Sequence, residues 1–163
     1  FSNAVSFNRY IGSWNTSNIT NMIYMFRGAS AFNQDIGSWN IKKVLSLSNI
    51  FFNAISFNGN INEWDTSNVI SMMSTFNGAS SFNQDIGSWD TSNVKNMECM
   101  FAYCKEFNQP LDKWNVSNVV NMASLFYDCF YFNQNLNTWC VSDITSEPSG
   151  FSPNSALIFS TRS

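Results

Sequence analysis

Residues 82–94 read FNQDIGSWDTSNV and residues 32–44 read FNQDIGSWNIKKV, so one motif occurs twice in a chain of 163 residues. Tryptophan fixes the period of the repeat, because it recurs at one constant spacing. The six tryptophans are Trp14, Trp39, Trp64, Trp89, Trp114 and Trp139. A unit of this length cannot bury its own aromatic side chains, whereas stacked units bury equivalent residues against one another. The spacing predicts a stack of 25-residue coils.

Other positions keep the same phase and define the expected core. Two phenylalanine columns, one asparagine column and several aliphatic columns recur without insertion or deletion; they begin at Phe1, Phe7, Asn8, Ile11, Ile19 and Met22. The column that begins at Phe1 continues in phase as far as Phe151. Stacked asparagine amides commonly satisfy one another and nearby backbone groups, so the asparagine column is interpreted as structural.

Each coil contains two segments with different apolar periods. Residues 14–17 alternate large apolar, polar, β-branched and polar side chains, which predicts a short parallel strand with one buried face. Residues 19–32 space their apolar side chains by three and four, which predicts a helical or 3-10 turn. The expected fold is a leucine-rich-repeat-like solenoid of about six coils over residues 1–144, starting in mid-repeat, with residues 145–163 as a tail that caps it.

The motifs themselves resemble a known family. Residues 25–39 read MFRGASAFNQDIGSW, and together with residues 82–94 they resemble the BspA-like leucine-rich-repeat surface proteins, first catalogued as mycoplasma proteins of unknown function. The resemblance covers residues 1 to about 144. It implies a cell-surface or secreted protein associated with adhesion or surface assembly, and it brings no catalytic residues. Two departures are the stretch NIKKVLSL at residues 40–47 and Glu147, which stands in the methionine column.

Composition excludes several classes of function. Only 12% of residues are charged, the net charge is -3, and no basic cluster occurs, so the footprint of a nucleic-acid-binding protein is absent. The chain has no histidine, which removes the usual general base. No apolar run reaches the length of roughly 18 residues that a membrane span requires. We therefore expect a non-enzymatic, extracellular repeat protein without a cofactor, which is a structural or adhesive component of a cell surface, fibre or sheath.

The outward side chains of the predicted strands form the candidate ligand face. Its central column is Asn15, Asn40, Asp65, Asp90 and Asn115. Asp65 and Asp90 are one coil apart, and like charges at that distance are unfavourable unless a cation relieves them, which makes the pair a candidate calcium site. A ligand-binding module for calcium or a glycan is thus the alternative function, and a simply solvated surface is the plainer interpretation.

Cysteines and glycosylation motifs add further candidates. Cys104 and Cys129 occupy one column in adjacent coils, a separation that suits a disulfide, although parallel side-chain directions would strain it. Buried free thiols are the alternative. Acceptor motifs for N-glycosylation occur at Asn15, Asn18 and Asn115.

Aromatic residues replace small ones in the last two coils. The replacements are Tyr103, Tyr127, Phe130 and Tyr131. They form a candidate interface patch, which either lies under the tail or contacts a partner. The expected partners are other proteins, surface glycans, or further copies of the chain that associate through the solenoid ends.

Overall fold

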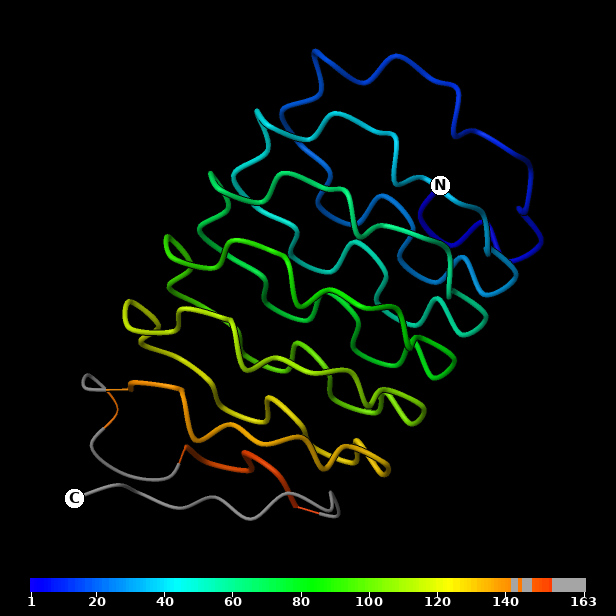
Figure 1. Cartoon of the computed structure of the whole chain (residues 1–163). Coiled ribbons are helices and arrows are strands. Elements are labelled where there is room, and N and C mark those ends of the chain that lie inside the picture. Colours follow the sequence, from blue (N-terminus) through cyan, green and yellow to red (C-terminus); the bar gives the residue numbers. More distant parts are fainter. Residues whose placement is uncertain (142–143, 145–147, 154–163) are drawn as a thin grey trace.

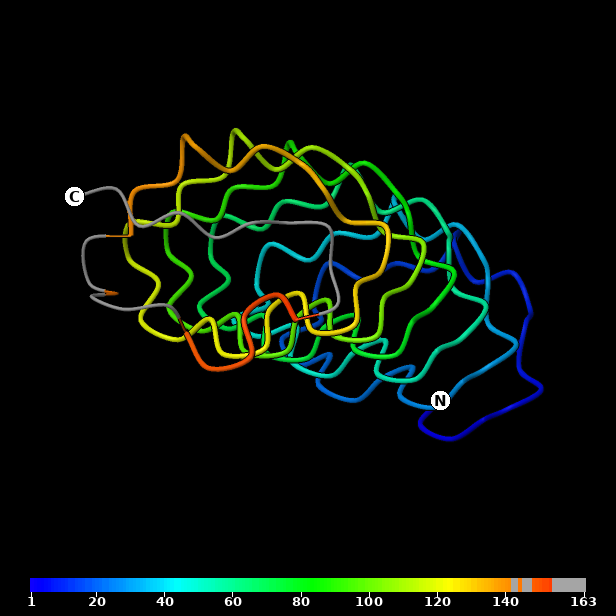
Figure 2. The same ribbon diagram turned by 90° about the horizontal axis from the view of Figure 1, so that it is seen from below.

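The computed structural model describes residues 1–141, 144 and 148–153. The chain winds into successive coils that stack along one direction, from the N-terminal coil at one end to residues 148–153 at the other (Figure 1). Seen at right angles, the coils surround a common interior (Figure 2). The coils repeat in register, so that Trp14 stacks on Trp39 with ring centroids 6.3 Å apart, and Trp64 stacks on Trp89 at 6.1 Å. Equivalent residues thus lie directly above one another.

Hydrogen bonds between coils replace regular secondary structure. The described residues contain no helix and no extended strand, and their only β-bridges are isolated parallel ones. These bridges pair Ser46 with Ser71, Ser71 with Asn96, and Asn96 with Asn121. Around each bridge, alternate backbone N–H groups donate to carbonyls of the next coil. The donors in one coil are Leu47, Asn49, Phe51 and Asn53, and the acceptors are Ser71, Met73, Thr75 and Asn77, at 2.7–3.0 Å.

Residues between these donors close tight turns within their own coil. The N–H of Ile50 donates to the carbonyl of Leu47 at 3.2 Å, and the N–H of Ala54 donates to the carbonyl of Phe51 at 2.9 Å. Two residues of each coil adopt a positive φ on this path. The first is Tyr24, Asn49, Ser74, Cys99 or Ser124, with φ between 54° and 61°, and the second, four positions later, is Gly28, Asn53, Gly78, Tyr103 or Asp128, with φ between 52° and 74°. A left-handed residue interrupts any helix, so the spacing of three that predicted a helical turn comes from consecutive β-turns.

The strand predicted at residues 14–17 is also wrong. Residues 17 and 18 form a turn, and the side-chain oxygen of Asn15 accepts the N–H of Ser17 at 3.1 Å. Such turns direct alternate side chains inward, which explains why Thr66, in the column of Thr16, is only 1% exposed. The alternation of apolar and polar residues at 14–17 therefore indicates which side chains point inward, and it does not indicate a strand. The β-bridges between coils form elsewhere, at Ser46 and its equivalents.

Two columns of phenylalanine form the centre of the core. Phe26 and Phe32 stack at 4.1 Å within one coil, and Phe26 stacks on Phe51 of the next coil at 5.7 Å, all three fully buried. The same pairs recur through Phe126 and Phe132. Burying one such side chain contributes about 1.5–3 kcal/mol. The repeated stacking makes the core continuous along the whole stack.

Polar ladders run beside the aromatic columns. The side-chain oxygen of Asn58 accepts the N–H of Asn83 at 2.9 Å, and the same bond recurs along the column that begins at Asn8. The indole N–H of Trp64 donates to the carbonyl of Ile36 at 2.9 Å, as the other buried tryptophans do with their preceding coils. Among the described residues, every buried side-chain nitrogen or oxygen has a partner. The ladders therefore satisfy the polar atoms that stacking buries.

The last described segment begins a seventh coil. The N–H of Phe126 donates to the carbonyl of Phe151, whereas the equivalent N–H of Phe76 donates to Met100, so that strict repetition would place the later acceptor at residue 150. Phe151 is therefore one position out of register. The prediction that it continues the phenylalanine column is wrong. Of the tail predicted at residues 145–163, only 148–153 lie within the described residues.

Candidate functional site

The predicted ligand face is exposed, but its polar side chains are engaged in their own coils. Each side-chain oxygen of the central column accepts the N–H of the residue two positions later, at 2.9–3.1 Å. This column is Asn15, Asn40, Asp65, Asp90 and Asn115. Asn and Asp commonly close turns in this way. The repeated residue type is thus explained by the turn that each coil needs at this point.

Asp65 shows the electrostatics of this face. Its carboxylate accepts both the N–H and the hydroxyl of Ser67, at 3.1 and 2.5 Å. These two hydrogen bonds, with a smaller contribution from Lys42, lower the pKa of Asp65. Asp90 accepts the N–H of Ser92 at 2.9 Å. Within the described ranges, no three cysteine or acidic side chains gather as a metal site would require. Calcium binding by Asp65 and Asp90 stays a prediction.

The neighbouring asparagine column links adjacent coils. The amide of Asn68 donates to the carbonyl of Lys42 at 2.9 Å, and the ammonium of Lys43 donates to the side-chain oxygen of Asn18 at 3.0 Å. The three predicted glycosylation sites, Asn15, Asn18 and Asn115, are all exposed. In the motifs that begin at Asn15 and Asn115, the asparagine oxygen accepts the hydroxyl of the third residue of the motif. Glycosylation itself stays a prediction.

The proposed disulfide between Cys104 and Cys129 is absent, and the alternative of free thiols holds. The two side chains point the same way in adjacent coils, so each sulfur lies against the backbone of the preceding coil instead of against the other sulfur. Cys104 donates to the carbonyl of Ala79 at 3.2 Å, and Cys129 donates to the carbonyl of Cys104 at 3.1 Å. Burial raises the pKa of Cys129 to about 12 and raises that of Cys104 well above its usual range. Both thiols therefore stay protonated at neutral pH.

The predicted aromatic patch lies largely at the surface. Tyr103, Phe130 and Tyr131 are 46%, 64% and 59% exposed, and Tyr127 is half-buried. Tyr103 and Tyr127 meet edge to face at 5.4 Å, as do Phe130 and Tyr131 at 6.4 Å. Rings at these angles do not form one flat platform, such as stacking against a sugar would use. The patch is uneven, and its phenol groups supply polar edges.

Sequence reasoning missed two further surface features. Leu45, Ile70 and Val120 share one column and are 56%, 44% and 63% exposed, which gives an apolar stripe that the exposed Lys95 interrupts between Ile70 and Val120. The common column could have revealed this stripe. The guanidinium of Arg27 lies over the rings of Tyr24 and Phe52 at 5.7 and 5.5 Å. This second contact depends on turn geometry that the repeat pattern does not report.

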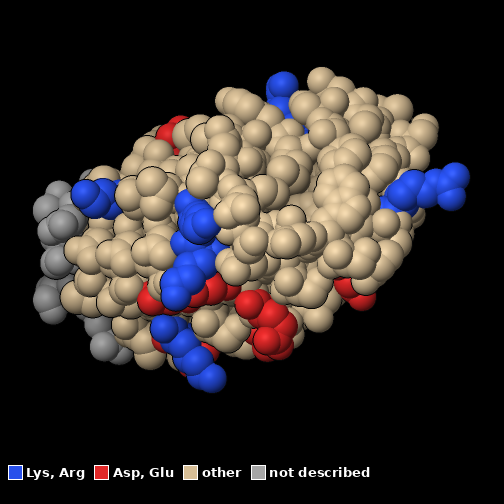
Figure 3. Space-filling model, turned by 90° about the horizontal axis from the view of Figure 1, so that it is seen from above, with Lys and Arg blue, Asp and Glu red and all other residues tan. Residues whose placement is uncertain are grey.

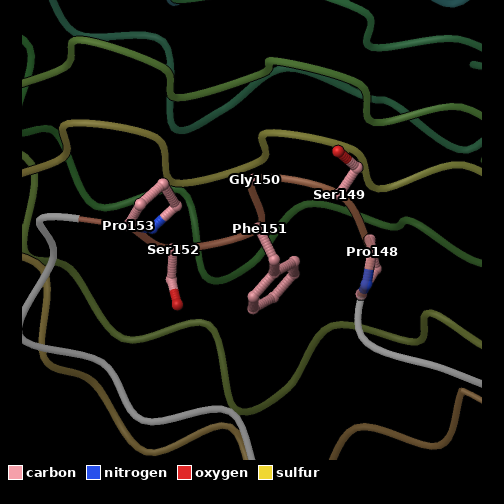
Figure 4. Close-up of a pocket in the computed structure, with 6 residues that line it drawn as sticks. All are labelled: Pro148, Ser149, Gly150, Phe151, Ser152 and Pro153. Atoms are coloured by element: carbon pink, nitrogen blue, oxygen red, sulfur yellow. The ribbon is translucent and has the colours of Figure 1, made fainter.

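Only 12% of the residues of the chain are charged. The face in Figure 3 is largely uncharged, and the few basic and acidic side chains lie interspersed on it. Among the described residues, those that line one pocket belong to the segment 148–153 (Figure 4). They are proline, serine, glycine and phenylalanine, and none of these described residues is an acid, a base or a metal ligand of ordinary strength.

The family described as "Mycoplasma protein of unknown function, DUF285" matches residues 1–79 and again residues 59–159. This chain belongs to the DUF285 family. No curated protein sequence and no solved structure matches this DUF285 chain. Within the part of the DUF285 chain that the structure describes, no helix has the length and apolar character needed to cross a membrane. The family assignment agrees with a mycoplasma-type repeat and names no activity.

Proposed function

We propose that this DUF285 chain is a non-enzymatic extracellular repeat protein that serves as a structural or adhesive component of a cell surface, fibre or sheath. The observation that carries the proposal is the continuous aromatic core, in which rings stack from coil to coil at 5.5–6.4 Å along the length of the described chain. Such a core resists bending because every coil is fixed against its neighbours. A rigid spacer suits presentation of a surface better than it suits catalysis.

We further propose that the chain is a leucine-rich-repeat-like solenoid of the BspA-like surface type. It is supported by the 25-residue stacking period and by the motif resemblance, and it includes adhesion only by analogy with that family. Polar side chains on the candidate face close turns in every coil, so the proposal gives them no catalytic role.

An oxidising extracellular location has to be reconciled with free thiols. Thiolate is the species that oxidants attack, and burial keeps Cys104 and Cys129 protonated. Reduced cysteines can therefore persist in the core of a secreted protein. The proposed location does not require the disulfide that the sequence suggested.

The alternative is a ligand-binding module. What favours it is the exposure of Asp65 and Asp90 in adjacent coils, since carboxylate oxygens are calcium ligands. Addition of about 1 mM calcium, the range in which extracellular modules bind it, would then raise the melting temperature of the wild-type chain. The variant Asp65→Asn, Asp90→Asn keeps the turn-closing oxygens and would lose this response. An equal melting temperature with and without calcium in the wild-type chain would exclude the module.

Location and adhesion are tested separately. Antibodies against the chain should label intact cells of the source organism as strongly as permeabilised ones, and labelling only after permeabilisation would overturn the extracellular assignment. For adhesion, beads coated with the chain are retained under flow on protein-coated or glycan-coated glass.

The adhesion variant gives the aromatic patch the residues that the fourth coil has at the same positions. It is Tyr103→Gly, Tyr127→Asn, Phe130→Ser and Tyr131→Ser, after Gly78, Asn77, Ser80 and Ser81. The matched control changes the apolar stripe instead, with Leu45→Thr and Val120→Thr after Thr20. We expect retention to fall at least several-fold for the patch variant alone. Unchanged retention would leave only the structural form of the proposal.

A further inference from the structure

The final described segment departs from the rule that joins all earlier coils. In those coils each N–H that donates to the next coil reaches its acceptor at one fixed offset along the chain, as Phe76 does at the carbonyl of Met100. The equivalent donors Ser124, Phe126 and Asp128 instead bond Ser149, Phe151 and Pro153 at 2.8–3.1 Å, and each acceptor lies one position beyond that offset. The seventh coil is thus displaced by one residue along the chain. Gly150, with φ 63°, occupies the left-handed position that Ser124 has in the sixth coil, with φ 55°.

This displacement removes a group that a further coil would need. With the shift, Pro148 stands where Leu47, Met72 and Met97 stand in the earlier coils, and each of those three donates its N–H to the next coil. Proline has no N–H to donate. The carbonyls of the segment receive the hydrogen bonds of the sixth coil, while the first donor toward an eighth coil is missing.

The parallel stacking of the aromatic column also changes at this segment. Rings of this column stack nearly parallel in the earlier coils, as Phe101 does on Phe126 at 5.6 Å and 3°. Phe151 meets Phe126 at 5.5 Å and 88°, so that the two rings are nearly perpendicular. Phe151 is itself only 1% exposed. Within the described residues, the parallel stacking of this column therefore stops at Phe126, and the ring that follows it is turned by about a right angle.

We propose that residues 148–153 are an end cap that stops the stack and prevents a second copy of this chain from continuing it. Without the cap, the sixth coil would present three N–H donors in a row beside the flat ring of Phe126. Within the chain, such a row always meets the carbonyls of another coil of the same kind, so the partner that fits the bare end is a coil of a second copy. This inference does not rest on the proposed function, and it concerns only the end of the stack that the sixth coil forms.

Two full-length variants remove the cap in different ways. Phe151→Ala deletes the ring that packs against Phe126. Gly150→Val places a β-branched side chain at a positive φ, where a Cβ would lie 2.9 Å from the hydroxyl oxygen of Ser124. The control Phe76→Ala deletes a fully buried ring from the middle of the stack and leaves the cap untouched.

Hydrogen exchange of the backbone amides measures how readily the cap detaches from the sixth coil. Light scattering over a hundred-fold range of protein concentration measures self-association. We expect the amides of Ser124, Phe126 and Asp128 to exchange at least ten-fold faster in both cap variants, which then form dimers and longer species. The wild-type chain and Phe76→Ala remain monomeric.

Three results would overturn the proposal. One is faster exchange at these amides in variants that stay monomeric. Another is unchanged exchange in both variants, because the packing described would then not hold the segment in place. The third is equal association of the wild-type chain or of the control.

Discussion

Replacing Asn58 by alanine tests whether the asparagine ladder stabilises the stack. Its side-chain oxygen accepts the N–H of Asn83 at 2.9 Å and the amide of Gln84 at 3.1 Å, and Gln84 also donates to the carbonyl of Asn58 at 2.9 Å. Alanine removes the acceptor, but Gln84 keeps its bond to the carbonyl. The loss is therefore one unpaired N–H at a half-buried site, which costs about 1–3 kcal/mol. We expect the lower half of this range, because water reaches the site in part.

A matched variant separates the hydrogen bond from the size of the side chain. Asn58→Asp keeps the accepting oxygen, and among the described residues the NH₂ group of Asn58 donates no hydrogen bond that this change would remove. It should therefore unfold within about 0.5 kcal/mol of the wild type at neutral pH, the usual range for surface substitutions. Its two donors favour the charged form, so the pKa of the new carboxyl falls on folding. The stability that it contributes is present above the unfolded pKa of about 3.9 and is lost as the pH falls through the lower folded pKa.

The assay is urea unfolding followed by tryptophan fluorescence, since each of the first six coils has a tryptophan. The slope of free energy against urea should stay constant, so that the shift in midpoint reports stability alone. Equal destabilisation by alanine and aspartate would mean that the amide group, and not the accepting oxygen, matters. A shift below about 0.5 kcal/mol for alanine would mean that water replaces the bond at no cost. Either result refutes the ladder as a source of stability.

Three other predictions address the remaining contacts. Trp64→Phe loses an indole hydrogen bond to the preceding coil and should cost about 1–2 kcal/mol in urea unfolding, whereas Trp14→Phe, at a residue that is 51% exposed, should cost under about 0.5 kcal/mol. Gly78→Ala should cost at least about 1–2 kcal/mol by the same assay, because φ is 74° and the new Cβ would overlap a side chain of the preceding coil; a neutral result would contradict that geometry. A maleimide should label the exposed Cys140 within minutes at pH 8, whereas Cys129, whose pKa is raised to about 12, should be labelled only as fast as the chain unfolds. Mass spectrometry measures both labelling rates, and fast labelling of Cys129 would show that its burial is transient.

The period and the core could be predicted from the sequence because burial acts on each column in the same way. Phe32 and Trp39 were expected inside from their phase alone, and they are 0% and 3% exposed. The asparagine column was expected to bond to backbone groups of neighbouring coils, and the bonds from Asn33 and Asn58 confirm it. These features depend on spacing, which the sequence reports directly.

The local backbone could not be predicted because different structures direct side chains inward with the same period. A turn closed by Asn15 places its neighbours as a strand would, and consecutive β-turns space side chains as a helix would. The shift at Phe151 could not be predicted for a related reason. By sequence this residue is in phase with the phenylalanine column, whereas its carbonyl accepts the hydrogen bond that strict repetition would give to residue 150. Cys104 and Cys129 were placed correctly in one column, but their parallel directions separate the sulfurs.

The hydrogen bonds of the asparagine ladder affect how the genes that encode these repeats can change in length. Each coil offers one side-chain oxygen to the next coil and takes one from the coil before, so a duplicated block of 25 codons finds every partner atom already in place. Deletion of a whole block likewise joins two compatible faces, whereas a gain or loss of a few codons would misplace all columns beyond it. Unequal recombination in whole units is therefore tolerated, and length becomes a trait that can vary between relatives without new contacts having to evolve.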